Sequence, residues 1–431
     1  MKVQERTLAN KLARNVPALL CLRFAHQFMV IMPVAVPFFF SKGLSMQEIF
    51  SLQAIFAAVV LVSEVPSGYL ADALGRRGVI RLGAALVALG HGLLLIVEGF
   101  PGLAVYELAL GLGFSMLSGA DMALLYDTEL ARGSSAERQR RVVSRIFSIG
   151  QVAAALSAAL CSALIWVGDL SLVILVQALT GGAIVLASLP LTEAPRLTAD
   201  GQPGNMPSVM QSVSILAALW HSSKLLRATF IAISCWPLLS YFAAWLIQQL
   251  WILEGIDLIY FGLLWGGLLW GGLSLLVAIF GRLVPWLEDR LGPTALLAGI
   301  GLLPVVGYAG MALSDGLVTL IWAALFFAAR GLISVLLGDA LNRRVPGSHR
   351  ATVNSMASCL FRVGVVLGGP WTGFAVDVWG MQAALIGLCV ISIPVSAGLL
   401  LPLIRVLASA EASADPAGVG QRQLPRSAKE I

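Results

Sequence analysis

The chain has 431 residues, of which 58% are hydrophobic and 12% are charged, and its formal net charge is +5 at pH 7. Because soluble domains carry about 25% charged residues, this composition excludes an ordinary soluble protein. The apolar residues form runs of about 20, the length that a helix needs to cross a hydrocarbon core. The runs are continuous rather than alternating, so they are predicted to be transmembrane helices and not barrel strands.

Twelve membrane spans are predicted along the chain. They cover residues 16–40, 47–69, 78–98, 102–126, 143–167, 170–190, 227–252, 259–284, 294–313, 317–338, 351–376 and 381–404. The longest polar connection, LTEAPRLTADGQPGNMPSVMQSV, follows the sixth span and divides the spans six and six. The sequence therefore predicts an all-α membrane protein with two six-helix bundles, 1–190 and 227–404. A cytoplasmic linker (191–226) and a disordered cytoplasmic tail (405–431) complete the predicted organisation.

The five cysteines all lie inside apolar runs, and no CxxC motif occurs. Free cysteine behaves as a small apolar side chain in such surroundings. We therefore expect packing roles for the cysteines, no metal site and no cofactor.

The distribution of arginine and lysine predicts the orientation in the membrane. With a cytoplasmic N-terminus, the basic residues of the loops fall almost entirely on the cytoplasmic side, as the positive-inside rule requires. They are Lys2, Arg6, Lys11, Arg14, Arg76, Arg77, Arg81, Arg132, Arg138, Arg140, Arg141, Arg145, Arg343, Arg344 and Arg350. This bias explains the basic net charge without a nucleic-acid partner, and an even number of spans places both termini in the cytoplasm.

The two halves resemble each other in sequence. SGADMALLYDTEL (118–130) aligns with RGLISVLLGDALN (330–342), which matches Asp127 with Asp339. YLADALG (69–75) aligns with WLEDRLG (286–292), which matches Asp72 with Asp289 and Gly75 with Gly292. Internal repeats are characteristic of secondary transporters, whose substrate site lies between the repeats.

Charged residues and glycines gather in GYLADALGRRG (68–78), between the second and third spans. Gly68 is expected to let its helix approach a neighbour, and Gly75 to permit a tight turn. Asp72 is placed to accept hydrogen bonds at a loop, while Arg76 and Arg77 hold the loop in the cytoplasm. A charged contact of this kind, or latch, contributes more to stability when docking excludes water, so its strength can differ between two conformations.

This stretch resembles the signature of the major facilitator superfamily, GxLaDrxGrr, with Ala73 in place of the usual basic residue. The resemblance extends over about 400 residues and implies two bundles that rock about a central cavity. In that family the aspartate docks near the start of helix 11, where Arg350 or the neighbouring amides would be its counterpart. The candidate gating residues are Glu64, Gly68, Asp72, Gly75, Arg76, Arg77, Asp127, Asp289, Asp339 and Arg350.

Three further segments resemble a bacterial branch of the superfamily that is distantly similar to the molybdate-anion transporter group. They are EVPSG at 64–68, SG…ALLYD in the fourth span and RAT at 350–352. A bacterial inner-membrane location follows from this resemblance. The drug–proton antiporter signature is missing from the fifth span, which reads VAAALSAALCSAL at 152–164, and the fourth span lacks the usual arginine.

Ionisable residues inside membrane helices are functional candidates by default. Helices 1, 4, 7 and 10 line the central cavity in the family that the chain resembles. The candidate cavity residues are Arg23, His26, Glu107, Asp121, Trp236, Tyr241, Trp245, Arg330 and Arg362.

Purely structural roles are open for several of these residues. Arg23 can pair with Asp121 or Asp127, and Arg330 with Asp339. Arg362 can anchor its helix, and Glu64 is better placed as a latch partner than as a substrate ligand. Asp121 and Glu107 are the candidate proton carriers.

The glycine-rich stretch FGLLWGGLLWGG (261–272) contains two GxxxG spacings and is expected to allow close helix packing. The sequence lacks the GxxxxGK[ST] motif of an ATP-driven pump, and it lacks HExxH and GxSxG. It therefore indicates neither a nucleotide-driven machine nor an intramembrane enzyme.

These features together predict a monomeric secondary transporter, not an enzyme, whose partners are a small-molecule substrate, protons and the lipid bilayer. Proton-coupled export of an organic compound is the favoured activity. Uptake or exchange of a carboxylate or oxyanion is the alternative, suggested by the three arginines in the spans. A non-transporting receptor or scaffold is a more remote alternative.

Overall fold

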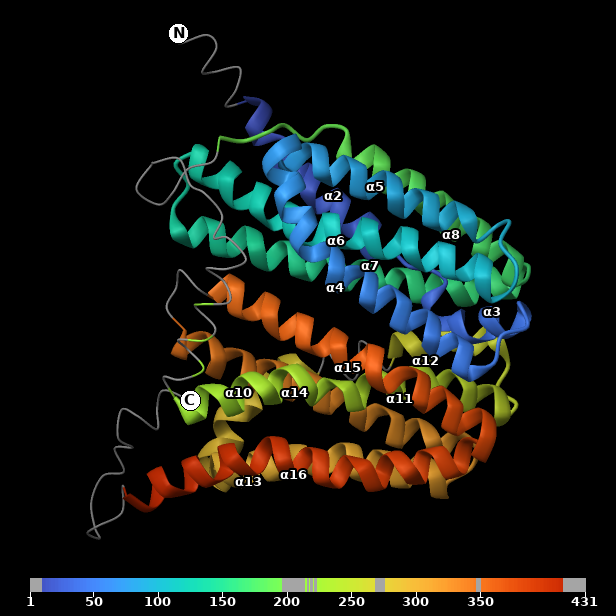
Figure 1. Ribbon diagram of the computed structural model, residues 1–431, viewed down its shortest axis with the longest axis vertical. Helices are drawn as coiled ribbons and strands as arrows, with labels where there is room; N and C mark the ends of the chain where they lie inside the picture. Colours follow the sequence, from blue (N-terminus) through green and yellow to red (C-terminus); the bar gives the residue numbers. More distant parts are fainter. Residues whose placement is uncertain are drawn as a thin grey trace. The chain divides into compact units, whose positions relative to one another are not determined.

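The computed structural model describes residues 10–195, 214, 217, 220, 223–267, 276–345 and 350–413. Among these residues, ten helices are long and apolar enough to cross a membrane. The predicted third span, 78–98, corresponds to an eleventh helix, α5 (Arg76–Leu93). The architecture is the all-α, multi-span arrangement that the sequence predicts (Figure 1).

The helices fall into two compact units, and the first contains the N-terminal half of the chain with the segment Asp257–Gly266. Its elements are α2 (Asn15–Gln27), η1 (Met32–Val34), α3 (Ala35–Ser41), α4 (Met46–Leu74), α5, α6 (Gly99–Ala131), α7 (Ala136–Val167), α8 (Leu170–Ser188) and most of α12 (Leu258–Gly267). Helix α6 packs against α4 and α5, and α8 lies beside α5 and α2 (Figure 1).

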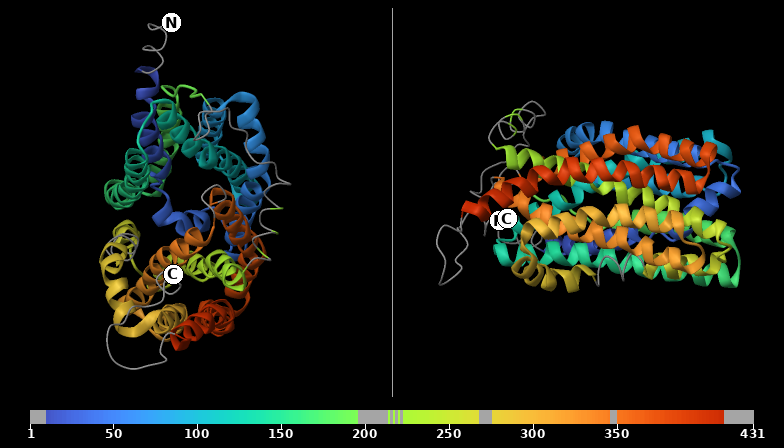
Figure 2. Two further views of the ribbon diagram at one scale, coloured as in Figure 1. Left: turned by 90° about the vertical axis from the view of Figure 1, so that its left-hand side faces the viewer. Right: turned by 90° about the horizontal axis from the view of Figure 1, so that it is seen from below.

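The second unit contains the remaining helices of the C-terminal half. They are α10 (Lys224–Cys235), α11 (Pro237–Leu253), α13 (Leu276–Leu313), α14 (Thr319–Arg344), α15 (Arg350–Trp379) and α16 (Met381–Ser413), with the short η3 (Gly316–Val318) before α14. Helices α13 and α16 run side by side, and α13 also packs against α14 (Figures 1 and 2).

The first long span of each half is interrupted, whereas the sequence predicts one helix over 16–40 and one over 227–252. In the first half the chain leaves the helix after Gln27, and Pro33 lies at the start of the short η1. In the second half α10 ends at Cys235 and α11 begins at Pro237. Proline has no backbone N–H to continue the hydrogen-bond ladder, which accounts for the interruption at Pro237 and for the proline at the start of η1.

The predicted loop between the second and third spans is reduced to one residue. Helix α4 extends through Asp72 to Leu74, and α5 begins at Arg76. Gly75 alone departs from helical geometry, with φ 78° and ψ 158°. Gly292, its predicted partner in the repeat, interrupts α13 with φ 77° and ψ 153°. The tight turn predicted at Gly75 is therefore confirmed, and the same backbone conformation recurs at the matched position of the second half.

The close helix approach expected at Gly68 is not found among the described residues. A methyl group built at Gly68 would meet no atom of the described residues within 4 Å, so none of their helices approaches this glycine closely. The close approach occurs instead at Gly262 of α12, where a methyl group would lie 2.2 Å from the Ala158 carbonyl oxygen of α7. The packing role predicted for the glycine-rich stretch is thus confirmed at Gly262, while Gly271 and Gly272 lie outside the described residues.

One predicted boundary also needs correction. The tail predicted to be disordered from residue 405 continues as helix to Ser413, since α16 runs through LASAEAS, which is rich in helix-favouring alanine. Helix α12 covers the start of the predicted span 259–284 and α13 covers its end from Leu276, while residues 268–275 lie outside the described part of the chain.

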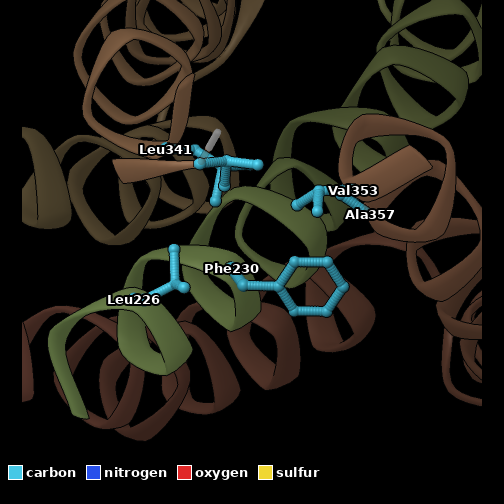
Figure 3. Close-up of a cluster of buried hydrophobic side chains, with 6 residues drawn as sticks. Leu226, Phe230, Leu341, Val353 and Ala357 are labelled. Atoms are coloured by element: carbon cyan, nitrogen blue, oxygen red, sulfur yellow. The ribbon is translucent and has the colours of Figure 1, made fainter. Parts of the chain in front are cut away.

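A buried apolar cluster joins the ends of three helices in the second unit (Figure 3). Leu226 and Phe230 of α10 pack with Leu341 of α14 and with Val353 and Ala357 of α15. Trp220 adds an edge-on contact to Phe230, with ring centroids 6.4 Å apart. Burial of these side chains stabilises the arrangement of the three helices within the unit.

Candidate functional site

The N-terminus of α5 is capped by a carboxylate from a distant part of the chain. Glu193, which follows α8, accepts hydrogen bonds from the backbone N–H groups of Arg76 and Arg77, each at 2.8 Å. The first N–H groups of a helix have no partner inside the helix, and its N-terminus favours negative charge. Glu193 therefore ties the segment after α8 to the turn between α4 and α5.

Arg76 connects the same turn to α6. Its guanidinium forms an ion pair with Asp127, the two groups being 2.5 Å apart, and it also donates a hydrogen bond to the Ala123 carbonyl oxygen. Asp127 is 5% exposed. Because a buried charge is tolerated only when it is paired, Arg76 and Asp127 depend on each other. Asp127 thus pairs with Arg76 and not with Arg23.

A second set of polar contacts fastens α2 to the same end of the unit. The fully buried Asn15 donates to Thr128 Oγ1 at 2.9 Å and to the Thr192 carbonyl oxygen at 2.8 Å, and its Oδ1 accepts from the Thr192 N–H at 2.8 Å. Nearby in sequence, buried Glu129 pairs with Arg132 at 3.3 Å and with Arg138 of α7 at 3.0 Å. We call the residues of these contacts, together with those of the two preceding paragraphs, the end network. It consists of Asn15, Arg76, Asp127, Thr128, Glu129, Arg132, Arg138, Thr192 and Glu193.

Of the residues in the end network, only Arg76 and Asp127 are among the gating candidates that the sequence predicts. Glu64, another candidate, is half-buried in α4, and Arg77 contributes its backbone N–H. The side chains of Asp72, Asp289, Asp339 and Arg350 lie outside the part of the structure that is described, so the predicted docking of Asp72 near Arg350 stays a prediction.

Arg23 of α2 lies opposite Asp121 of α6. The guanidinium and carboxylate are 3.9 Å apart, and both side chains are largely buried. Asp121 also accepts a hydrogen bond from the Met122 N–H at 2.6 Å. Arg23 Nε is buried and has no hydrogen-bond partner among the described residues. The structure thus realises the first of the two pairings left open for Arg23.

Aromatic rings lie next to this pair. His26, one turn after Arg23, contacts Phe114 of α6 with ring centroids 5.2 Å apart, and Phe114 contacts Phe56 of α4 at 5.6 Å. All three side chains are half-buried. A cation, an acid and flat apolar surfaces therefore lie together on α2, α4 and α6.

Glu107 is buried at another level of α6, where it faces α4. Its Oε1 accepts a hydrogen bond from Gln53 Nε2 at 3.2 Å. The two candidate proton carriers, both on α6, thus contact different helices. Asp121 contacts α2, and Glu107 contacts α4.

A buried polar cluster that the sequence does not identify supports the interruption of the first span. Gln177 of α8 accepts a hydrogen bond from the Ile31 N–H at 3.2 Å, and its amide contacts the His91 ring of α5 at 3.2 Å. Thr180 completes the cluster. Side-chain partners of this kind satisfy backbone groups that leave a helix at membrane depth.

The candidates in the second unit are positioned by α10, α11, α14 and α15. Trp236 is fully buried beside Pro237, and its Nε1 has no hydrogen-bond partner among the described residues. Tyr241 contacts Phe361 of α15 edge-on, with ring centroids 5.6 Å apart. Trp245 is buried, Arg362 half-buried and Arg330 exposed.

Comparison with known proteins agrees with this architecture. The family model of the Major Facilitator Superfamily matches residues 19–342, about three quarters of the chain. A comparison with curated protein sequences gives no match.

Solved structures of transporters share the fold at low sequence identity. The nucleoside transporter NupG (D323A mutant) has a TM-score of 0.72 and 14% identity, covering 91% of this chain and 99% of its own. A bacterial homologue of the human lysosomal transporter Spinster, inward-facing and unoccupied, has a TM-score of 0.71 and 15% identity, covering 93% and 98%. A POT family transporter in complex with 5-aminolevulinic acid has a TM-score of 0.66 and 14% identity, covering 91% and 96%. With the family match over most of its length and the multi-span fold, the chain belongs to the Major Facilitator Superfamily of membrane transporters.

Proposed function

We propose that this protein moves a small organic molecule across the bacterial inner membrane by alternating access, as a proton-coupled exporter with both termini in the cytoplasm. The observation that carries the proposal is the Arg76–Asp127 pair, a buried ion pair at the gating motif of the family. When a buried charge loses its partner, or water reaches a buried ion pair, the free energy of that state changes by several kcal/mol. Such a contact can bias one conformation of a transporter against another.

The turn that carries Arg76 is suited to transmit this bias. Glu193 holds its backbone N–H groups and Asp127 holds its side chain, so one short segment contacts both the end of α8 and α6. Release of the turn would therefore loosen three helices of the first unit together. This supports a gating role for the end network.

The substrate class is proposed from the residues of this chain and not from its structural neighbours. Those neighbours include a nucleoside transporter and peptide transporters at 13–16% identity, which is a similarity of fold alone. In the first unit, half-buried aromatic rings lie beside Arg23 and Asp121. This surface suits an organic molecule with a flat apolar part and a polar group.

One observation favours uptake or exchange of an anion as a second candidate function. Arg23 Nε is buried without a hydrogen-bond acceptor among the described residues, and its ion pair with Asp121 spans 3.9 Å. A carboxylate or oxyanion could supply the missing acceptor, because guanidinium binds planar oxyanions through paired N–H groups. The resemblance to the branch near the molybdate-anion transporter group points the same way.

A thermal-shift screen of purified protein against drugs, metabolites and oxyanions distinguishes the two candidates. A bound ligand stabilises the folded protein by mass action. An organic cation or neutral compound among the hits supports the export proposal, whereas hits confined to anions that Arg23→Gln abolishes support the second candidate.

Transport of the strongest hit is then measured in proteoliposomes with an imposed proton gradient. Flux that an uncoupler abolishes supports proton coupling. Flux that persists unchanged when the gradient is dissipated contradicts it.

A further inference from the structure

Three carboxyl groups are buried among the described residues, and their partners differ. Asp127 pairs with Arg76. Glu129 pairs with Arg132 and Arg138. Glu107, which is 4% exposed, receives a single hydrogen bond from the neutral amide of Gln53. Within the part of the chain that the structure describes, Glu107 is thus the buried acid without a cation.

Among the described residues, no cation is paired with Glu107 to compensate an ionised carboxylate. Gln53 is itself buried in α4, and Tyr106, the preceding residue of α6, is buried as well. Leu103 and Leu110, about one turn to either side, belong to the apolar core. Within the described part of the chain, the site is therefore a buried, mainly apolar setting in which Gln53 donates the one recorded hydrogen bond to the carboxyl.

Four titratable groups on the helices packed against α6 contact residues other than Glu107. His91 of α5 contacts Gln177 and Thr180, and Arg23 of α2 lies opposite Asp121. On α7, Arg138 pairs with Glu129. On α4, Glu48 forms the capping box with Ser45, and Glu64 lies eleven residues beyond Gln53.

We propose that Glu107 is the proton-binding site of the first unit, with Gln53 as the residue that positions it. The assignment to Glu107, and not to Asp121, deepens the proposed function and rests on it for the link to transport. Burial of an isolated carboxylate charge is very costly, so the closed site holds the neutral acid. Gln53 donates to Oε1, which leaves Oε2 to carry the proton.

Loss of the proton requires a change in the surroundings of the carboxyl. When the α4–α6 contact opens and water enters, the Oε2–H bond breaks, the proton passes to water, and the carboxylate is hydrated. Closure reverses these steps. Asp121 differs, because Arg23 compensates its charge at 3.9 Å in the same structure.

Infrared spectroscopy of the purified protein tests this assignment without a known substrate. The carbonyl stretch of a protonated carboxylic acid is distinct from the bands of an ionised carboxylate. We expect such a band at neutral pH in the wild type and in Asp121→Asn, and its loss in Glu107→Gln. Glutamine keeps the side-chain size, and size-exclusion chromatography verifies that each variant is folded.

Gln53→Leu adds a readout that a merely structural role would not change. Removal of the donor to Oε1 should shift the protonated-acid band of Glu107 to higher frequency while the band persists. A band that survives Glu107→Gln, or its absence from the wild type at neutral pH, overturns the assignment. Failure of every transport assay with the band present would contradict the proposed function and leave the protonation site standing.

Discussion

Glu193 illustrates how one residue stabilises a helix that begins far away in the sequence. It lies 117 positions from Arg76, yet its carboxylate accepts hydrogen bonds from the first N–H groups of α5. Replacing a capping side chain costs about 0.5–2 kcal/mol. We expect Glu193→Ala to lower the thermal stability of the detergent-solubilised protein.

Glu137 provides the matched control for this prediction. Its ion pair with Arg141 is exposed on both sides, 72% and 68%. Exposed pairs contribute about 0–1 kcal/mol, so Glu137→Ala should leave the melting temperature nearly unchanged. Equal losses in the two variants would refute the capping role of Glu193.

The Arg76–Asp127 pair predicts non-additive mutational effects. Either Arg76→Gln or Asp127→Asn leaves a largely buried charge without its partner, and breaking a buried pair costs about 3–5 kcal/mol. The double variant removes both charges and should recover part of that loss. A double-mutant cycle on thermal unfolding measures the coupling, and strictly additive losses would show that the pair contributes no interaction energy.

At the scale of elements, the turn between α4 and α5 depends on a glycine for two separate reasons. Gly75 has φ 78°, and a methyl group there would lie 2.8 Å from Glu193 Oε2. We expect Gly75→Ala to reduce stability and the yield of folded protein in a fluorescence size-exclusion assay.

Gly68 is the control on the same helix. A methyl group there meets no atom within 4 Å in the part of the chain that the structure describes, and alanine favours helix by about 1 kcal/mol over glycine. Gly68→Ala should therefore be neutral or stabilising in that assay. A harmful Gly68→Ala together with a tolerated Gly75→Ala would contradict the roles of both glycines.

The extent of the helices was predictable where composition decides it. The apolar runs identify most spans, and the repeat predicts that Gly75 and Gly292 share one role, which their matching backbone angles confirm. The interruption at Pro237 and the helical end of α16 were not predicted, although the sequence carries a signal for each, a proline inside the predicted span 227–252 and an alanine-rich segment after residue 405.

The end network was only partly predictable. Arg76 and Asp127 stand out as charges near span ends, but Asn15, Thr192 and Glu193 are ordinary polar residues until the fold brings them together. The acid in LTEAPR, directly after an apolar run, was the one available signal for Glu193.

At the scale of the whole molecule, the family match places the chain among the transporters of the Major Facilitator Superfamily, whereas its substrate and its coupling to protons are proposals. The end network belongs to the first unit, and the interrupted spans and glycine turns recur in both halves. These features are consistent with a duplicated unit whose two copies share the same interrupted first span and the same glycine turn.

Counterflow in proteoliposomes tests the central claim most directly. Vesicles containing purified protein are loaded with an unlabelled hit from the thermal-shift screen, and entry of the labelled compound is followed. We predict transient accumulation above equilibrium in protein-containing vesicles and none in empty vesicles. Entry at the same rate in both kinds of vesicle, for every compound that binds, would contradict transport by alternating access.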